Sequence, residues 1–211
     1  MIDREPQMET LLQGATRLFA ALGYDSTTLR QISDALGIDP VKVGFTGDKR
    51  DLYLAVIERA YRIETEAMGP AITGVVVADA AQAAAAIHTI VDRYLDFCVE
   101  HPEFPALWIH RWLYDAADLT GLERQFSQPL ITMATRVLEQ AVTDGFVGSG
   151  VDMEYCVWTL VWCVHGFVQG GVLDLEGERV GPDSAEELAR FRGHLHQLTQ
   201  RVLSLPEDAT P

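Results

Sequence analysis

Cysteine is scarce in this chain of 211 residues, which contains only three. Cys98, Cys156 and Cys163 form no C-x-x-C pair or other spacing typical of a zinc site, and three cysteines do not provide the disulfide framework of a small secreted domain. We expect them to be small buried side chains in a reducing compartment. A redox-sensing role is the alternative.

Long hydrophobic runs are also missing. No stretch of 18 uncharged apolar residues opens the chain, and residues 1–5 are too charged for a signal peptide. The most apolar long segment, residues 152–175, contains Asp152, Glu154 and Asp174, so we expect a buried or dimer-forming helix there and not a membrane span. The expected location is the cytoplasm.

Motifs of known catalytic chemistry are absent as well. The sequence contains no G-x-S-x-G elbow, no Walker loop and no H-E-x-x-H pair. His194 and His196 are two residues apart, as are Cys163 and His165, and side chains at that spacing on a helix point apart. We therefore expect no enzyme activity, no metal site and no cofactor.

Positively charged residues are few: the chain contains 16 Lys and Arg and 31 Asp and Glu, which gives a net charge of −15. Residues 1–60 hold seven Lys and Arg against nine Asp and Glu, a net of −2, which leaves −13 for the rest of the chain. Arg30, Lys42, Lys49 and Arg50 gather in one N-terminal segment. Since phosphate contact is local, such a patch on an acidic protein can still bind DNA.

Helical periodicity is what the sequence does have. Hydrophobic residues make up 48% of the chain, and none of them alternate with period two for long enough to form a sheet. The pattern predicts an all-α fold of about nine helices. They are expected over residues 9–22, 29–36, 40–45, 49–68, 83–99, 107–117, 122–144, 153–173 and 185–205, with 206–211 as a flexible tail.

The segment from Thr27 to Tyr53 predicts a helix-turn-helix. Thr28 and Gln31 have the spacing of a capping box, and Gly37 follows the last apolar residue of the first helix. Asp39 and Pro40 are typical of the start of a second helix. Two helices joined by so short a turn can present the second helix to a DNA major groove.

The residues around this segment resemble the N-terminal domain of TetR-type transcriptional regulators. The resemblance lies in the ordered blocks LFAALGYDSTT, RQISDALGI and F-x-x-x-K-x-x-L, and it covers roughly the first 60 residues. It implies a DNA-binding domain over residues 1–50 and a ligand-binding and dimerisation domain over residues 51–205. The residues expected to contact DNA are Thr28, Arg30, Pro40, Val41, Lys42, Val43 and Lys49.

One departure from the family pattern lies in the recognition helix. The run Lys42-Val43-Gly44-Phe45 is about one residue short, and Gly44 stands where the family has a phosphate-contacting Tyr. Glycine costs a helix about 1 kcal/mol relative to alanine. Two alternatives follow: a divergent regulator that still binds DNA, or a related protein that has lost operator binding and binds a small molecule or a protein partner.

Aromatic residues of the C-terminal part suggest an apolar cavity with a few polar groups. The resemblance implies that this cavity lies in the helical bundle and binds an uncharged or cationic, largely hydrophobic effector. Binding is expected to shift the helix that starts at Lys49 and to release a palindromic operator. The candidate ligand-binding residues are Phe97, Trp108, Trp112, Met133, Trp158, Trp162 and His165.

The last two helices carry apolar stripes that predict a homodimer seam, as a twofold operator requires. The alternative is that the stripes close the core of a single chain. The stripe residues are Val157, Leu160, Val161, Val164 and Val168 on one helix, and Leu188, Phe191, Leu195, Leu198, Val202 and Leu205 on the other.

Overall fold

The computed structural model describes residues 4–205 apart from Val76 and Ser149, and the predicted all-α fold is confirmed over this part of the chain. A short π-helical segment precedes α6, and the only strands among these residues, β1 and β2, have two residues each. The elements are α1 (Arg4–Leu22), α2 (Leu29–Leu36), α3 (Lys49–Ile72), α4 (Ala80–Glu100), α5 (Glu103–Trp112), η1 (Glu123–Ser127), α6 (Gln128–Thr143), α7 (Met153–Gly170), β1 (Val172–Leu173), β2 (Arg179–Val180) and α8 (Ala185–Leu203).

The chain forms two compact units. Unit 1 comprises Met1–Ile63 and Glu103–Phe126, and unit 2 comprises Glu64–Pro102 and Ser127–Pro211. In unit 1, α1 packs against α2 and α5. The rings of Phe19 and Tyr53 meet edge to face at 5.1 Å, and both side chains are buried at the centre of this unit.

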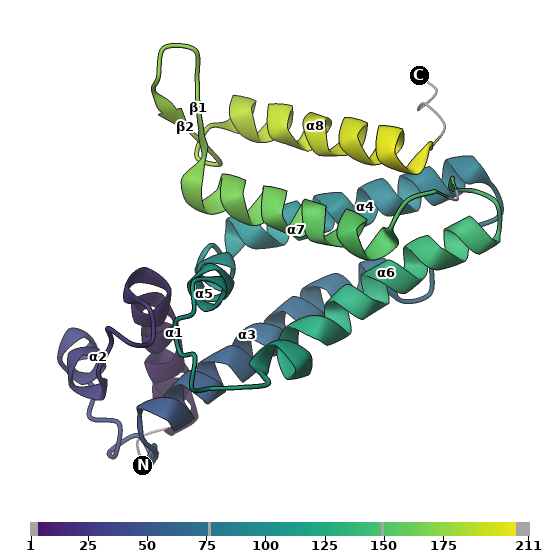
Figure 1. Ribbon diagram of the computed structural model, residues 1–211. Coiled ribbons are helices and arrows are strands. Elements are labelled where there is room, and N and C mark those ends of the chain that lie inside the picture. The colour runs from purple at the N-terminus through teal and green to yellow at the C-terminus, as the bar shows by residue number, and fades with distance from the viewer. Residues whose placement is uncertain (1–3, 76, 149, 206–211) are drawn as a thin grey trace. The chain divides into compact units, whose positions relative to one another are not determined.

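Unit 2 is a helical bundle in which α7 packs on α4 and α6, while α8 packs on α4 (Figure 1). The antiparallel β1–β2 hairpin joins α7 to α8 (Figure 1). Leu95, Val164 and Leu195, from three different helices, are almost completely buried. The core of this bundle therefore closes within a single chain.

Some predicted helices have different ends in the structure. The helix predicted to end at Met68 continues to Ile72 and includes Pro70 in its last turn. Helix α5, predicted to begin at Leu107, begins at Glu103 instead. Pro105 falls in its first turn, where the missing N–H has no helical partner anyway. It ends at Trp112, before Tyr114 and Ala116 enter the left-handed region.

The predicted helix over residues 40–45 is wrong: the structure has a turn there. Phe45 N–H donates to the Pro40 carbonyl at 2.9 Å and Gly44 N–H donates to Val41 at 3.1 Å, but no helix continues. Gly44 has φ = +92°, which a right-handed helix does not allow. The expected tail, residues 206–211, lies outside the described residues.

Candidate functional site

The α2 segment in unit 1 has the predicted caps. Thr28 Oγ1 accepts a hydrogen bond from Gln31 N–H at 3.2 Å, and Gln31 Oε1 accepts one from Thr28 N–H at 2.8 Å. Gly37 ends the helix with φ = +62°. This reciprocal capping box fixes the start of α2, so the predicted first half of the helix-turn-helix is confirmed.

The turn over residues 39–45 presents two side chains outward and one inward. Val41 is 67% exposed, and Lys42 is exposed beside Asp39, with 4.0 Å between Nζ and the carboxylate. Pro40 is half-buried. Val43, which was expected to face DNA, is only 5% exposed and belongs to the core of unit 1.

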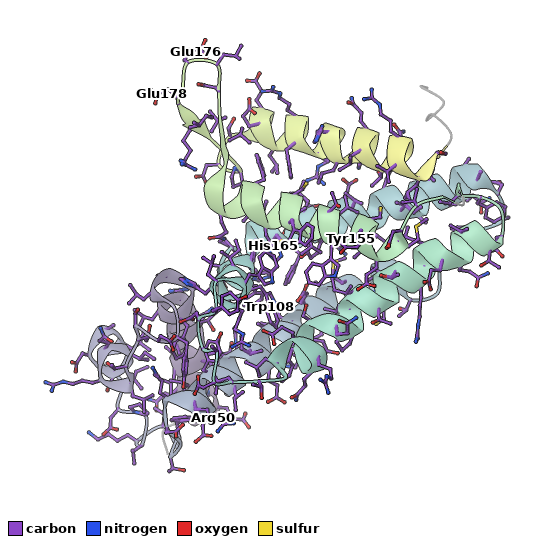
Figure 2. The ribbon with its side chains drawn as sticks, in the orientation of Figure 1. Arg50, Trp108, Tyr155, His165, Glu176 and Glu178 are labelled. Carbon is purple, nitrogen blue, oxygen red and sulfur yellow. The ribbon has the colours of Figure 1, made fainter. Side chains whose placement is uncertain are left out.

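Of the predicted basic contacts, the Arg30 side chain extends into solvent, whereas the Lys49 side chain is bound within unit 1. Arg30 is 91% exposed and lies 3.6 Å from Asp34 on the same helix face. The Lys49 ammonium donates to the Tyr24 carbonyl at 3.0 Å and lies 4.1 Å from the centre of the Tyr24 ring. Arg50, the next residue, is exposed (Figure 2). The exposed cations of this segment are therefore Arg30, Lys42 and Arg50.

Two side chains, one in the last turn of α5 and one just after it, hold unit 1 together, and sequence reasoning did not find these roles. Asp115 accepts hydrogen bonds from the backbone N–H groups of Tyr24, at 2.6 Å, and Asp25, at 2.9 Å. The Arg111 guanidinium donates hydrogen bonds to Leu119 O at 3.1 Å and to Glu123 Oε1 at 2.7 Å. Asp115 is about 90 residues from Tyr24 and Asp25 in the sequence, so no local pattern predicts this contact.

The seven candidate ligand residues are divided between the two units. Trp108 and Trp112 lie on α5 of unit 1, and both are half-buried. In unit 2, Phe97 is buried, Met133 on α6 is half-buried, and Trp158 stacks on Trp162 with 5.8 Å between ring centres. Trp162 is 49% exposed. His165 is buried and shares a 2.7 Å hydrogen bond with the Tyr94 hydroxyl.

A groove of about 370 Å³ in unit 2 contains none of these candidates. It lies between the end of α3, α4 and α6, with Ile72, Ala83 and Ile87 among its apolar residues and Arg136 and Asp144 among its charged ones. Arg136 is exposed, so the groove opens at the surface.

A group of ionisable side chains inside unit 2 includes Tyr94, whose hydroxyl shares a hydrogen bond with His165. Tyr94 and Cys98 come from α4, and Glu64 comes from α3. Burial lowers the pKa of His165 to about 4 and raises that of Glu64 to about 7. Burial and the nearby Glu64 charge raise the pKa of both Tyr94 and Cys98. At neutral pH, Glu64 is therefore the only member of this cluster that carries a net charge.

Sequence reasoning missed Glu64, although a signal was present. Buried residues of α3 recur at Tyr53, Ile57, Ala60 and Met68, and Glu64 falls on the same stripe, four residues from each of the last two. A carboxylate on the buried stripe of an amphipathic helix is costly unless it has a role.

Two kinds of feature are absent from the part of the chain that the structure describes. None of its helices has both the length and the apolar character needed to cross a membrane. In the same part of the chain, no three His, Cys, Asp or Glu side chains are grouped so that they could hold a metal ion.

Comparisons with known proteins bear on the fold. No protein-family model and no curated protein matches the sequence. A regulatory protein of the tetR family from Rhodococcus RHA1 superposes with a TM-score of 0.70 at 15% identity, covering 94% of this chain and 97% of that one. The ketosteroid transcriptional regulator KstR2 of Mycobacterium tuberculosis gives 0.65 at 15% identity, covering 98% and 97%. AibR, solved with isovaleryl coenzyme A and operator DNA, gives 0.66 at 14% identity, covering 97% and 100%.

These similarities extend over nearly the whole length of each chain, so they concern both the N-terminal module and the helical bundle. The chain has the fold of the TetR-type transcriptional regulators.

Proposed function

We propose that this protein is a ligand-responsive transcriptional regulator of the cytoplasm, a dimeric repressor that a small hydrophobic effector releases from a palindromic operator. The observation that carries the proposal is the capped α2 segment with its exposed cations in a chain of this fold. Two proteins of the same fold support the proposal of a ligand-responsive regulator. AibR was solved with isovaleryl coenzyme A and operator DNA, and KstR2 is a ketosteroid transcriptional regulator.

In this proposal residues 1–50 bind DNA and residues 51–205 bind the effector and the second subunit. Arg30 contacts phosphates, while Val41 and Lys42 reach toward base edges from the turn that follows Pro40. Thr28 and the backbone amides at the start of α2 face the phosphates as well. Lys49 stabilises the module from within, since its ammonium is bound to Tyr24.

The proposed dimer uses the outer face of α7 together with α8. Val157, Val161 and Val164, expected at a seam, are buried in the single chain. The exposed stripe of α7 instead carries Tyr155, Thr159, Trp162, Gly166 and Gln169, which recur at intervals of three and four. Figure 2 shows Tyr155 and His165 on α7. Exposed aromatic side chains on one helix face are typical of a protein interface.

The deciding experiment is selection of random duplex DNA on the purified protein at moderate salt, followed by sequencing. Enrichment of a palindrome supports a dimeric operator binder. Enrichment of no sequence, by a folded dimer, contradicts it. Lys42→Ala is expected to alter sequence preference, and Arg30→Ala to weaken binding to all sequences about equally.

A second function is favoured by one observation: a turn stands where the recognition helix was expected, with Gly44 at φ = +92°. In that case the protein binds a small molecule or a protein partner without binding DNA. A ligand-binding chain that selects no duplex sequence would establish this alternative.

A further inference from the structure

The groove in unit 2 lies where the end of α3, the start of α4 and the end of α6 come together (Figure 1). Its deepest residues are apolar, and Ala83, Ile87 and Ala141 among them are almost completely buried. Because two of these three side chains are single methyl groups, the helices leave a space of about 370 Å³ between them. That volume is enough for a small molecule with an apolar chain.

One helix supplies all the charged side chains of this groove. Arg136, Gln140 and Asp144 are spaced four residues apart along the last turns of α6, so they form a row on one face of the helix. Eight residues of helix place the two ends of the row about 12 Å apart. The segment between α3 and α4 adds only apolar side chains, those of Val75 and Val77. The groove therefore has an apolar interior and one polar edge.

The two charges of the row are not equivalent. Gln140 Nε2 donates a hydrogen bond to Asp144 Oδ1 at 2.9 Å, so the carboxylate has a partner on its own helix. Among the described residues no carboxylate pairs with the Arg136 guanidinium. Asp144 also caps the C-terminal end of α6, where the helix dipole adds negative charge. An anion is therefore repelled at the Asp144 end of the row and attracted at the Arg136 end.

We propose that this groove binds a small amphiphilic carboxylate, with its head group on Arg136 and its apolar chain along Ala83, Ile87 and Ala141. The planar guanidinium matches a carboxylate in shape and charge. A cationic head group is repelled by Arg136, and an uncharged one leaves the guanidinium without an ionic partner. The site goes beyond the proposed function, since it contains none of the seven candidate effector residues and does not involve DNA.

The net charge of the molecule makes this preference diagnostic. The chain has a net charge of −15, so its overall field repels anions and attracts cations. Non-specific adsorption would therefore favour a cationic amphiphile over an anionic one of the same length. The opposite order of affinities requires a local positive charge beside an apolar surface, and Arg136 is the only cation that lines this groove.

The test uses decanoate, decanol and decyltrimethylammonium, three amphiphiles with the same apolar chain, titrated into the full chain without DNA at neutral pH. Calorimetry measures the affinities. We expect decanoate to bind about tenfold more tightly than decanol, and the cation to bind most weakly. Spectra of protein with isotope-labelled isoleucine methyl groups locate the ligand: Ile72 and Ile87 should shift, and Ile32, buried in unit 1, should not.

Arg136→Gln removes the charge from an exposed side chain, so the variant should fold as the wild type does. It should bind decanoate about tenfold more weakly and decanol with unchanged affinity. Arg93→Gln is the matched control, because Arg93 is an exposed arginine of α4 that does not line the groove. This control should leave all three affinities unchanged.

Three results would overturn the site. The first is equal binding of decanoate and decanol to the wild-type chain, and the second is binding of none of the three amphiphiles. The third is decanoate binding that persists in Arg136→Gln or leaves the methyl signals of Ile72 and Ile87 in place, since the anion then binds elsewhere. All three are distinct from failure of the duplex selection, which tests the regulator function itself.

Discussion

The Lys49 ammonium lies 4.1 Å from the centre of the Tyr24 ring and donates a hydrogen bond to the Tyr24 carbonyl oxygen at 3.0 Å. One side chain thereby joins the first turn of α3 to the segment that follows α1. Tyr24 also contacts Tyr53, with 4.8 Å between ring centres. This arrangement assigns Lys49 a structural role inside unit 1, whereas the sequence had suggested a phosphate contact.

Replacing Lys49 with Met, which keeps the aliphatic stem, should lower the free energy of unfolding by about 1–2 kcal/mol, from the lost cation–π contact and the lost hydrogen bond. Urea denaturation measures the loss. Lys42→Met is the control, because Lys42 is exposed and its pairing with Asp39 at 4.0 Å is a weak surface interaction. Equal, small effects of both substitutions would show that the Tyr24 contact does not stabilise the fold.

Two glycines should respond in opposite directions to alanine. Gly44 has φ = +92°, so Gly44→Ala forces a side chain into the left-handed half of conformational space and should destabilise by about 1–2 kcal/mol. Gly193 lies inside α8, and a Cβ added there meets nothing within 4 Å. Gly193→Ala should therefore stabilise by about 0.5–1 kcal/mol. Thermal unfolding of both variants checks the signs. Stabilisation by Gly44→Ala would mean that residues 40–45 form a helix after all.

The proposed dimer gives a third prediction. Trp162 is 49% exposed on the outer stripe of α7, so Trp162→Glu places a charge in the proposed seam and should shift the protein to monomers in sedimentation velocity. Leu175→Glu is the control, since Leu175 is fully exposed in the hairpin beside Glu176 and Glu178 (Figure 2). If Leu175→Glu dissociates the dimer while Trp162→Glu does not, the hairpin, and not α7, forms the contact.

The sequence predicted those features that depend on neighbours along the chain. Thr28, Gln31 and Gly37 define the two ends of α2 through contacts within a few residues, and the structure confirms them. The helix predicted over residues 40–45 is wrong, because six residues that include a glycine form too few hydrogen bonds to offset the cost of helix nucleation. The helical period also could have marked Glu64 as inward-facing, but its neighbours Tyr94 and Cys98 lie about 30 residues further along the chain. Only the tertiary fold brings them together.

The fourth prediction concerns the dependence of stability on pH. The Glu64 pKa is about 7 in the folded chain against 4.5 when exposed, so the unfolded state ionises first and Glu64 makes the protein less stable as pH rises from 4.5 to 7. His165 acts in the opposite direction: its folded pKa is about 4 against 6.5, so stability is lost as pH falls below 6.5. The two effects largely cancel in the wild-type chain between pH 4.5 and 6.5.

Subtraction of a variant separates the two effects. The stability of Glu64→Gln minus that of the wild type should be near zero at pH 4.5 and should grow to about 3 kcal/mol above pH 7, since each unit of pKa shift is worth about 1.4 kcal/mol. Urea denaturation across this range measures the difference, with Glu66→Gln, which removes an exposed carboxylate from the same helix, as the control. A flat difference for Glu64→Gln would mean that the carboxyl keeps its hydration in the folded chain.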